Sequence, residues 1–435
     1  MAFYRDRQLT HLASSISVFA ITIGLVVGQS ATQKSLAQTS TTPAPSGVTS
    51  INGSGGGSVN TLLVGTGTTS PYAPKGSWFN TYGVGNPKTL NPPGPVNPLV
   101  TWRYAAINSS AGVAAFFTQT PPPLTATNTA TILRPVSFAD TDDPITGTEK
   151  LSPGPNAGIP IQVPVITYGV SLAYNPTGLN VPAGGIKLSR ATYLGIFNGT
   201  ITNWNDAKIK ADNGGRVIAV NKPIVVVRRS DNSANTFTLS NNLRAAFGAT
   251  WNRGVGEKSI AQPASGIPNP LPANTVVWPA NFQSAAKSGG VATKIKTTAG
   301  AIGYVDNSTR LANGLQAAVL QNKAGTYNPI SSTSIRNAFV GATDQDPSPR
   351  RIKIVVTDPT AANAYPLVSA SYLLFYDKYA DVKIANGIKG FIGWALGTTA
   401  ADNIATARGY APLPDAIKTQ SKGVVNSYVN NALNP

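Results

Sequence analysis

Residues 224–248 read IVVVRRSDNSANTFTLSNNLRAAFG and indicate the fold class most clearly. The apolar start of this stretch, 224–227, has the length and valine content of a buried strand, and 228–232 has the composition of a turn. Ser233 stands where the N-cap of a helix is expected. The helix itself is indicated by Leu239, Leu243 and Phe247, four positions apart, and by Gly248 as its end. A strand, a short loop and an amphipathic helix in this order are typical of α/β proteins.

The rest of the chain repeats this alternation over 435 residues, enough for two or three domains. A further helix is predicted from Ile384, Ile388, Phe391 and Ala395, which share one helical face. The other runs that we predict as buried strands are TLLVG (61–65), VTWRYAAI (100–107), PIQVPVITYGVSLAYN (160–175), AIGYVD (301–306), RIKIVV (351–356) and PLVSASYLLFY (366–376). The predicted fold class is therefore α/β with buried strands.

The first 37 residues are typical of an export signal. Arg5 and Arg7 precede an apolar stretch over 12–27, and small residues around Ala37 offer a cleavage site. A retained membrane anchor is the alternative, and the shortness of the apolar stretch speaks against it. Residues 38–60 are mostly Ser, Thr, Gly and Pro, so we predict a flexible leader there.

Two residue types that catalytic sites use often are missing from the predicted mature chain. The sequence has no cysteine, and its one histidine, His11, lies in the predicted signal. This excludes the usual zinc ligands and both Ser-His-Asp and Cys-His catalysis. The absence of cysteine also excludes lipid attachment of the bacterial lipoprotein type, so we expect soluble export to the periplasm.

The chain is basic but sparsely charged. Only 12% of its residues are charged, and the formal net charge is +17. Residues 1–37 contain three of the 34 basic and one of the 17 acidic residues, which leaves +15 for the predicted mature chain. Such a balance favours anionic partners. The basic residues are spread singly along the chain, so a surface with dispersed, solvated charges explains the net charge equally well. We expect no nucleic-acid partner.

The loop in the opening stretch has the features of a small-anion site. The start of a helix presents free backbone N–H groups and the positive end of its dipole. An arginine next to it adds a fork suited to a tetrahedral oxyanion, and Asp231 could hold that fork in place. The alternative is a surface ion pair beside an ordinary helix cap.

Three other segments are polar in a similar way. GTGTTSP (65–71) follows the predicted strand TLLV, and INSSAGVAAFF (107–117) places Ser109 before a helix-like run. Taken alone, the first is more often a turn and the second more often a simple cap. SFADTDDPIT adds the carboxylates of Asp140, Asp142 and Asp143. An ionised carboxylate can accept the P–OH hydrogen of phosphate, whereas sulfate has no proton to give and would be repelled.

The order of these loops resembles that in the phosphate-binding proteins of bacterial phosphate ABC transporters, and more loosely that in their DING relatives, from about Thr61 to Ile417. GTGTTSP is similar to the family's first phosphate loop, INSSAGV to its second, FADTDDP to its aspartate segment and RSDNSANTF to its arginine segment. The similar framework motifs are LSRATYLGIFNGTITNWND (188–206), which is the most specific, AGAIGYVD (299–306) and GYAPLPDAI (409–417).

Carried over residue by residue, the resemblance implies a phosphate site of Thr69, Ser70, Ser109, Asp142, Arg229, Ser233 and Asn235, with Asp231 orienting Arg229. The chain departs from the family pattern at Ser70, where an aromatic residue is usual, and at Asn232 and Ala234, which replace glycines. Asn235 replaces a threonine. GSGGG (53–57) is the alternative first loop and receives less weight because it lies in the predicted leader.

The resemblance also implies a two-lobe periplasmic binding protein of type II with a hinge of two crossing strands. Lobe I would contain 48–167 and 361–435, and lobe II 168–360. We expect a monomer without enzymatic activity, cofactor or metal, which binds inorganic phosphate and delivers it to the membrane permease of an ABC transporter.

Other functions stay open at this point. They are a binding protein or sensor for another tetrahedral oxyanion such as arsenate, a secreted phosphatase of DING type, and an exported structural or adhesion protein that binds polyanions. For a phosphatase, Asp140, Asp142 and Asp143 form the only metal-capable cluster in the sequence.

Overall fold

The computed structural model describes residues 47–65, 76–83, 96–107, 109–119, 136–145, 156, 158–251, 253 and 276–431. The predicted signal (1–37) lies outside these residues, as do Thr69 and Ser70. No helix of the described part is long and apolar enough to span a membrane.

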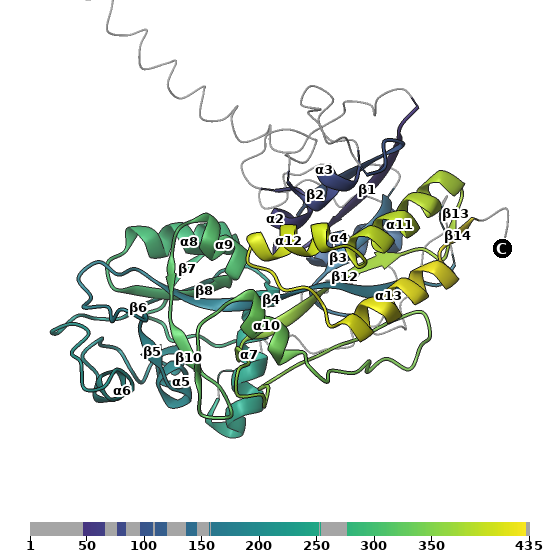
Figure 1. Cartoon of the computed structure of the whole chain (residues 1–435). Helices are drawn as coiled ribbons and strands as arrows, with labels where there is room; N and C mark the ends of the chain where they lie inside the picture. The colour runs from purple at the N-terminus through teal and green to yellow at the C-terminus, as the bar shows by residue number, and fades with distance from the viewer. Residues whose placement is uncertain are drawn as a thin grey trace, which may run out of the picture.

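Two α/β lobes share one sheet of nine strands (Figure 1). Its strands are β1 (Thr49–Gly55), β2 (Val100–Ala106), β3 (Val136–Thr141), β4 (Ile161–Tyr174), β6 (Val225–Arg229), β7 (Gln283–Ala285), β8 (Ala301–Asp306), β9 (Gln316–Ala317) and β12 (Val368–Phe375). The order is β2-β1-β3-β12-β4-β8-β6-β7, and β9 pairs with β4. β1 is parallel to β2 and β3 in the first lobe, and β6 is parallel to β7 and β8 in the second.

The strands β4 and β12 join the lobes, and they pair with each other in antiparallel fashion. All 14 residues of β4 are buried. Its first part pairs with β12, and from Val170 onward it pairs with β8 of the second lobe. The far end of β12 pairs with β3 of the first lobe, and its register against β4 shifts between Ser371 and Tyr372. These two strands therefore run from one lobe into the other.

The first lobe packs helices against β1–β4. Its helices are α2 (Asn60–Leu63), α3 (Trp78–Tyr82), α4 (Ser109–Thr118), α11 (Val382–Ala395), α12 (Thr399–Ala407) and α13 (Asp415–Tyr428), and it has a small sheet of β13 (Lys378–Tyr379) and β14 (Asn430–Asn431). Helix α4 lies on β1 and β3, and α13 lies on β4. Aromatic rings fill the interior, where Phe391 contacts Trp102 and Phe79.

The second lobe has helices on both faces of β6–β8, with α8 and α9 on the upper face and α7 below in Figure 1. Its helices are α5 (Arg190–Asn198), α6 (Ala207–Asp212), α7 (Ala234–Phe247), the 3-10 turn η2 (Gly248–Thr250), α8 (Lys287–Thr297), α9 (Asn307–Ala312) and α10 (Ser332–Ala338). A small sheet has the order β11 (Tyr327–Asn328), β10 (Val319–Gln321) and β5 (Lys187–Leu188).

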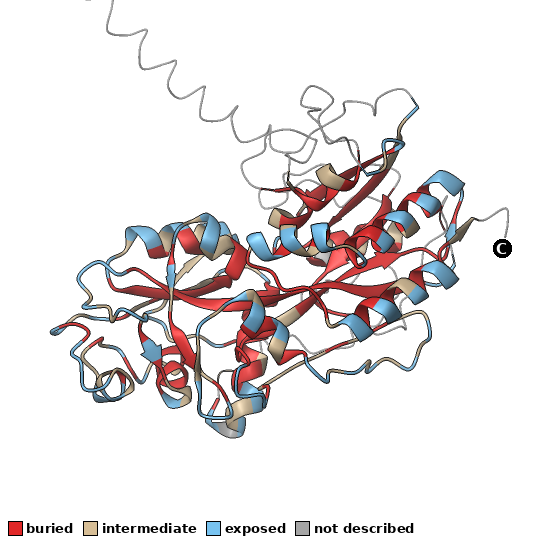
Figure 2. Cartoon of the chain, in the orientation of Figure 1, coloured by how far each residue is buried: buried red, intermediate tan, exposed pale blue. Residues whose placement is uncertain are grey.

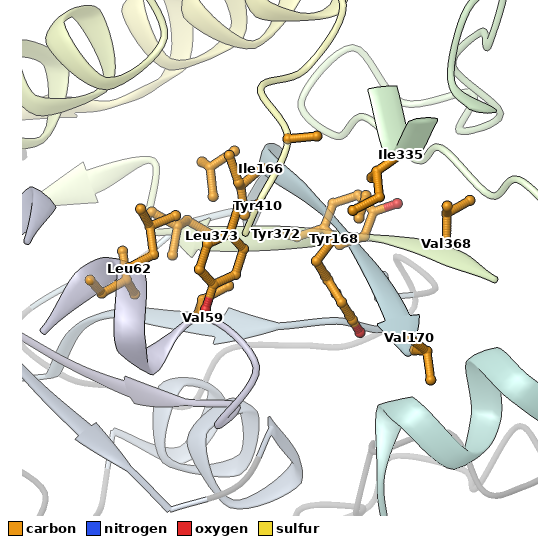
Figure 3. Packing of buried hydrophobic residues seen from close by; sticks show 14 of the residues in the cluster. Val59, Leu62, Ile166, Tyr168, Val170, Ile335, Val368, Tyr372, Leu373 and Tyr410 are labelled. Atoms are coloured by element: carbon orange, nitrogen blue, oxygen red, sulfur yellow. The ribbon is translucent and has the colours of Figure 1, made fainter. Parts of the chain in front are cut away.

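The core continues through the joint between the lobes. Figure 2 shows that the strands are buried along most of their length while the helices keep an exposed face. In Figure 3, side chains from β4 and β12 pack with Leu62 of α2 and with Tyr410, which precedes α13. Residues far apart in the sequence thus form one apolar cluster where the lobes meet.

Several predicted elements are confirmed. The opening stretch forms β6 and α7, with Ser233 as N-cap and Gly248 as C-cap. The difference is that β6 extends to Arg229, so the turn is shorter than predicted. The four apolar residues predicted to share a face of the later helix are all buried in α11.

Three predictions are wrong. Residues 49–60 are not part of a flexible leader, because 49–55 form β1 between β2 and β3. TLLVG is not a strand, since Asn60–Leu63 forms α2. RIKIVV forms no strand either. Arg351 makes an isolated bridge to Gln162, and local hydrogen bonds to Asp346 and Asp344 hold Arg351 and Lys353 in place of a ladder.

Candidate anion-binding site

The ends of β1 and β3 and the start of α4 meet at Gly56. A Cβ atom on this glycine would lie 2.8 Å from Ser109 Oγ, 3.0 Å from Asp140 Oδ2 and 3.3 Å from Asp142 Oδ2. Three side-chain oxygens from two elements therefore surround one point, where only glycine leaves room. We call Gly56, Ser58, Ser109 and Asp142 the first wall of the site.

Asp142 is the acidic group of this wall. It is 6% exposed, and its Oδ2 accepts a hydrogen bond from the Ser58 hydroxyl. Its Oδ1 is buried and has no hydrogen-bond partner among the described residues. Burial raises the pKa of Asp142 to about 6, although the nearby hydroxyls of Ser58 and Ser371 act in the opposite direction. A buried acceptor without a partner is costly, so this oxygen is suited to a ligand that brings a proton.

Asp140 lies behind the first wall and is fully buried. Its Oδ2 accepts a hydrogen bond from the Gly56 backbone N–H at 3.1 Å and lies within hydrogen-bond distance of Tyr104 Oη at 3.2 Å, and its Oδ1 accepts a hydrogen bond from Ser371 Oγ at 2.7 Å. Burial, and then the charge of Asp142, raise the pKa of Asp140 well above its usual value. Asp140 connects the loop after β1 to β2 and to the joining strand β12.

The end of β6 supplies the cationic group. Arg229 donates from Nε to Asp231 Oδ1 at 2.7 Å and from Nη2 to Asp231 Oδ2 at 2.6 Å. Asp231 Oδ1 also accepts from the backbone N–H of Lys287 at 3.0 Å. Burial raises the pKa of Asp231, but the hydrogen bonds and charge of Arg229 bring it below its usual value. The guanidinium group is therefore held in one orientation by a bidentate pair.

The start of α7 lies beside this arginine. Ser233 Oγ accepts from the Asn235 backbone N–H at 3.2 Å, and both residues are buried. The Asn235 amide donates to Ser288 Oγ at 3.1 Å and to Asp306 Oδ2 at 3.4 Å, so its donors are engaged by α8 and by the start of α9. We call Arg229, Asp231, Ser233 and Asn235 the second wall.

A chain of polar contacts joins the two walls. Tyr410 Oη donates to the Ser58 backbone oxygen and lies 2.6 Å from Thr61 Oγ1 and 2.9 Å from Ser308 Oγ. Thr61 Oγ1 donates to Ser308 Oγ at 2.8 Å, and Ser308 Oγ donates to Asp306 Oδ1 at 2.7 Å. Asp306 in turn contacts Asn235 and adds to the rise in the pKa of Asp142. We call Tyr410, Thr61, Ser308 and Asp306 the cross-lobe bridge.

A cavity of about 260 Å³ adjoins Asp142 between the lobes. Its lining comes from the end of β3, from α7, from 353–357 and from β12, and Lys353 is the only cationic residue in that lining. A space of this size holds several water molecules. Asp142 therefore borders both the anion site and a space from which water or an ion can reach it.

The structure brings most of the predicted site residues together in two groups. Ser109 and Asp142 meet in the first wall, and Arg229, Asp231, Ser233 and Asn235 meet in the second. The predictions for Thr69 and Ser70 fall outside the described residues. Gly56 lies in the GSGGG run (53–57), the alternative first loop, and Ser58 follows that run; neither was predicted as a site residue, because the run was assigned to the leader. In the described part, Asp140, Asp142 and Asp143 do not form a group that could hold a metal ion.

Comparison with known proteins gives matches along most of the chain. The model of the PBP superfamily domain matches residues 39–399. The phosphate-binding protein PstS of Pasteurella multocida is 30% identical over 288 residues, which are 66% of this chain and 75% of that protein. The phosphate-binding protein PstS 3 of Mycobacterium leprae is 27% identical over 335 residues, 76% of this chain and 80% of that protein.

Solved structures agree with the fold. A phosphate-binding protein from Stenotrophomonas maltophilia has a TM-score of 0.59 at 19% identity, covering 86% of this chain and 93% of its own. A high-affinity periplasmic phosphate-binding protein of DING type, solved with phosphate, has a TM-score of 0.56 at 21% identity, covering 88% of this chain and 96% of its own. The two-lobe α/β architecture is thus common to all three.

Proposed function

The chain belongs to the PBP superfamily, among the phosphate-binding proteins named PstS, and we propose that it captures inorganic phosphate for an ABC transporter. The observation that carries the proposal is Asp142 Oδ1, a buried acceptor without a partner among the described residues, in a site that also has an oriented arginine. Relatives named as binding proteins also support a protein that binds and releases its ligand without chemistry.

Each wall has a distinct task in this proposal. The ionised Asp142 accepts the hydrogen of a P–OH group through Oδ1, while Ser58 donates to its other oxygen. Arg229 neutralises the negative oxygens, and the N–H groups at the starts of α4 and α7 donate to them. Ser109 and Ser233 add hydroxyl groups. Fixed hydrogen-bond donors and one fixed acceptor of the protein would therefore replace the water molecules around phosphate.

The selectivity for phosphate over sulfate follows from Asp142, the hydrogen-bond acceptor of the proposed site. Sulfate has four oxygens and no proton, so an ionised Asp142 would face a sulfate oxygen at close range without a hydrogen bond. A site built around a hydrogen bond rejects a ligand that cannot form it by factors of about 10⁴ or more. Phosphate and arsenate both bring the needed proton, so the same site would admit arsenate.

The remaining parts of the proposal concern location and assembly. The basic and apolar start of the chain supports export to the periplasm, with cleavage near Ala37. Lobe I would contain 48–167 and 361–435, and lobe II would contain 168–360. The lobes would close on the ligand by bending of β4 and β12. The partner would be the membrane permease of an ABC transporter, and the protein would act as a monomer.

Isothermal titration calorimetry of the purified protein tests the proposal. We expect phosphate to bind at micromolar or lower concentration, and sulfate to give no heat at concentrations at least 10³ times higher. Equal affinities for the two anions, or no heat with phosphate, would refute it. Circular dichroism of the same sample establishes that the protein titrated is folded.

A further inference from the structure

We propose that Asp140 is a second carboxyl group of the phosphate site, which keeps its proton while Asp142 is ionised and which positions Gly56 through Tyr104. This inference rests on the proposed phosphate function, since the role of Asp140 is to support the first wall. Asp140 would be a positioning residue, because its three partners are protein groups.

The Tyr104 hydroxyl has one hydrogen and two oxygen neighbours. Its oxygen lies 2.7 Å from the Gly56 backbone oxygen and 3.2 Å from Asp140 Oδ2. The Gly56 oxygen can only accept, and it is the nearer atom, so it takes this hydrogen. Tyr104 Oη then presents a lone pair to Asp140 Oδ2. Two lone pairs at this distance repel, unless Oδ2 carries a hydrogen and donates it to Tyr104.

The charges around Asp140 also favour its protonated form. The groups that act on its carboxyl are Tyr104 of β2, Asp142 just after β3, Ser371 of β12 and the backbone of Gly56. Of these only Asp142 is charged, and its sign is the same. Burial raises the pKa of Tyr104 well above 10, so the tyrosine keeps its own proton and brings no charge. Two like carboxyl groups so close together and so far from water ionise one at a time.

The arrangement has a clear benefit for an anion site. Asp142 must be ionised to accept from phosphate, but a second negative charge behind it would repel the ligand. A neutral Asp140 removes that charge while it retains three hydrogen bonds. The resulting series, Asp140 Oδ2–H to Tyr104 Oη–H to the Gly56 oxygen, fixes the peptide unit of the glycine around which the first wall is built.

Infrared difference spectroscopy tests the protonation directly. Spectra of the wild-type protein and of Asp140→Asn are compared at about pH 8, where an ordinary carboxyl is ionised, with and without phosphate. We expect the wild type to show the C=O band of a protonated carboxylic acid that is missing from Asp140→Asn and still present in Asp142→Asn. A difference spectrum with carboxylate bands alone would overturn the inference.

Phosphate titration of two variants tests the positioning role. In Asp140→Asn the amide can donate to Tyr104 and accept from Ser371 as the protonated acid does, but its NH2 group cannot accept from the Gly56 N–H, so we expect affinity to fall by about fivefold. In Asp140→Ala all three partners lose their bonds, and we expect a larger loss of at least tenfold. If Asn were as damaging as Ala, donation to Tyr104 would not position Gly56 and the inference would be wrong. If the wild type bound no phosphate, the proposed function would fail, and the infrared test of ligand-free protein would still decide the state of Asp140.

Discussion

At the scale of the residue, Asp142 combines a benefit to binding with a cost to stability. The carboxyl is buried, and its Oδ1 has no partner among the described residues. The burial that keeps this oxygen away from water also raises the pKa of Asp142 in the ligand-free protein. The benefit to binding and the cost to stability are tested by different experiments.

The first prediction concerns stability against pH. Because the folded-state pKa of Asp142 is about 6 against an ordinary value of 3.8, its contribution to stability is fully present below about pH 4 and is lost as pH rises through 6. Asp142→Asn lacks this loss, so without phosphate it should be more stable than wild type above pH 6, by about 3 kcal/mol, and should approach it near pH 4. Urea unfolding across this range measures the difference. A constant difference between the two proteins would contradict the assignment.

The second prediction concerns selectivity. The amide of Asp142→Asn can donate to a sulfate oxygen, so the variant should bind sulfate at least tenfold more tightly than wild type. The wild-type protein should begin to bind sulfate as pH falls below about 6, because a protonated Asp142 is also a donor. Competition of sulfate with labelled phosphate measures both. Unchanged exclusion of sulfate in the variant would mean that another group selects the anion.

At the scale of the element, the loop after β1 is defined by the space that Gly56 leaves open. The third prediction is that Gly56→Ala lowers phosphate affinity at least tenfold, because its methyl group would meet Ser109 Oγ and Asp140 Oδ2 inside the first wall. Both contacts are with side-chain ends, so we expect the fold to persist. Calorimetry with phosphate measures the effect.

The next glycine in the chain supplies a matched control. A Cβ atom on Gly57 would meet nothing within 4 Å, so Gly57→Ala should bind phosphate as wild type does. If both variants lost binding equally, the cause would be the flexibility of the loop. If neither lost binding, phosphate would not lie against Gly56.

The elements that could be predicted from sequence are those whose side chains carry their own pattern. In α7 the apolar spacing, the Ser233 cap and the Gly248 end all agree, and the structure has all three. β1 was missed because its sequence, TSINGSG, has the composition of a leader. Its glycines are required by close packing, since a Cβ on Gly53 would lie 2.4 Å from the ring of Phe138. A strand whose glycines let neighbouring strands pack closely lacks the apolar residues by which a buried strand is recognised in a sequence.

The candidate site, too, was predictable only where a local sequence pattern indicates it. Arg229 and Asp231 are two residues apart in sequence, and Ser233 follows at a helix start, so local pattern sufficed. The approach of Gly56 to Ser109 and Asp142 depends on the pairing of β1 with β3 across more than 80 residues. No local pattern contains that pairing. The role of Asp140 behind the wall likewise requires the positions of Tyr104 and Ser371.

At the scale of the whole molecule, the cross-lobe bridge is the polar counterpart of the apolar joint. The fourth prediction is that Tyr410→Phe weakens phosphate binding by about tenfold, because the hydroxyl contacts Ser58 of the first wall as well as Ser308 of the second lobe. We expect the free energy of unfolding to fall by about 1 kcal/mol as well. Calorimetry and urea unfolding give the two values.

Tyr379→Phe is the matched control for this variant. The Tyr379 hydroxyl is also buried and also makes two hydrogen bonds, with Ser137 and Tyr376, but both partners lie in the first lobe. It should lose a similar amount of stability and keep its phosphate affinity. Equal loss of affinity in both variants would show that the effect comes from stability alone.

The single sheet has a consequence for the order in which the chain can fold. β3 ends at Thr141, and one of its two neighbours, β12, begins only at Val368. In the export proposed above, the chain would emerge from a translocation channel with its N-terminus first, and β3 would have an unpaired edge until almost the whole sequence had crossed. Such an edge invites pairing with another chain. The second lobe, whose β6, β7 and β8 lie within 225–306, can form its ladder earlier. Acquisition of the native state during export would thus begin in the middle of the sequence and end with the insertion of β12.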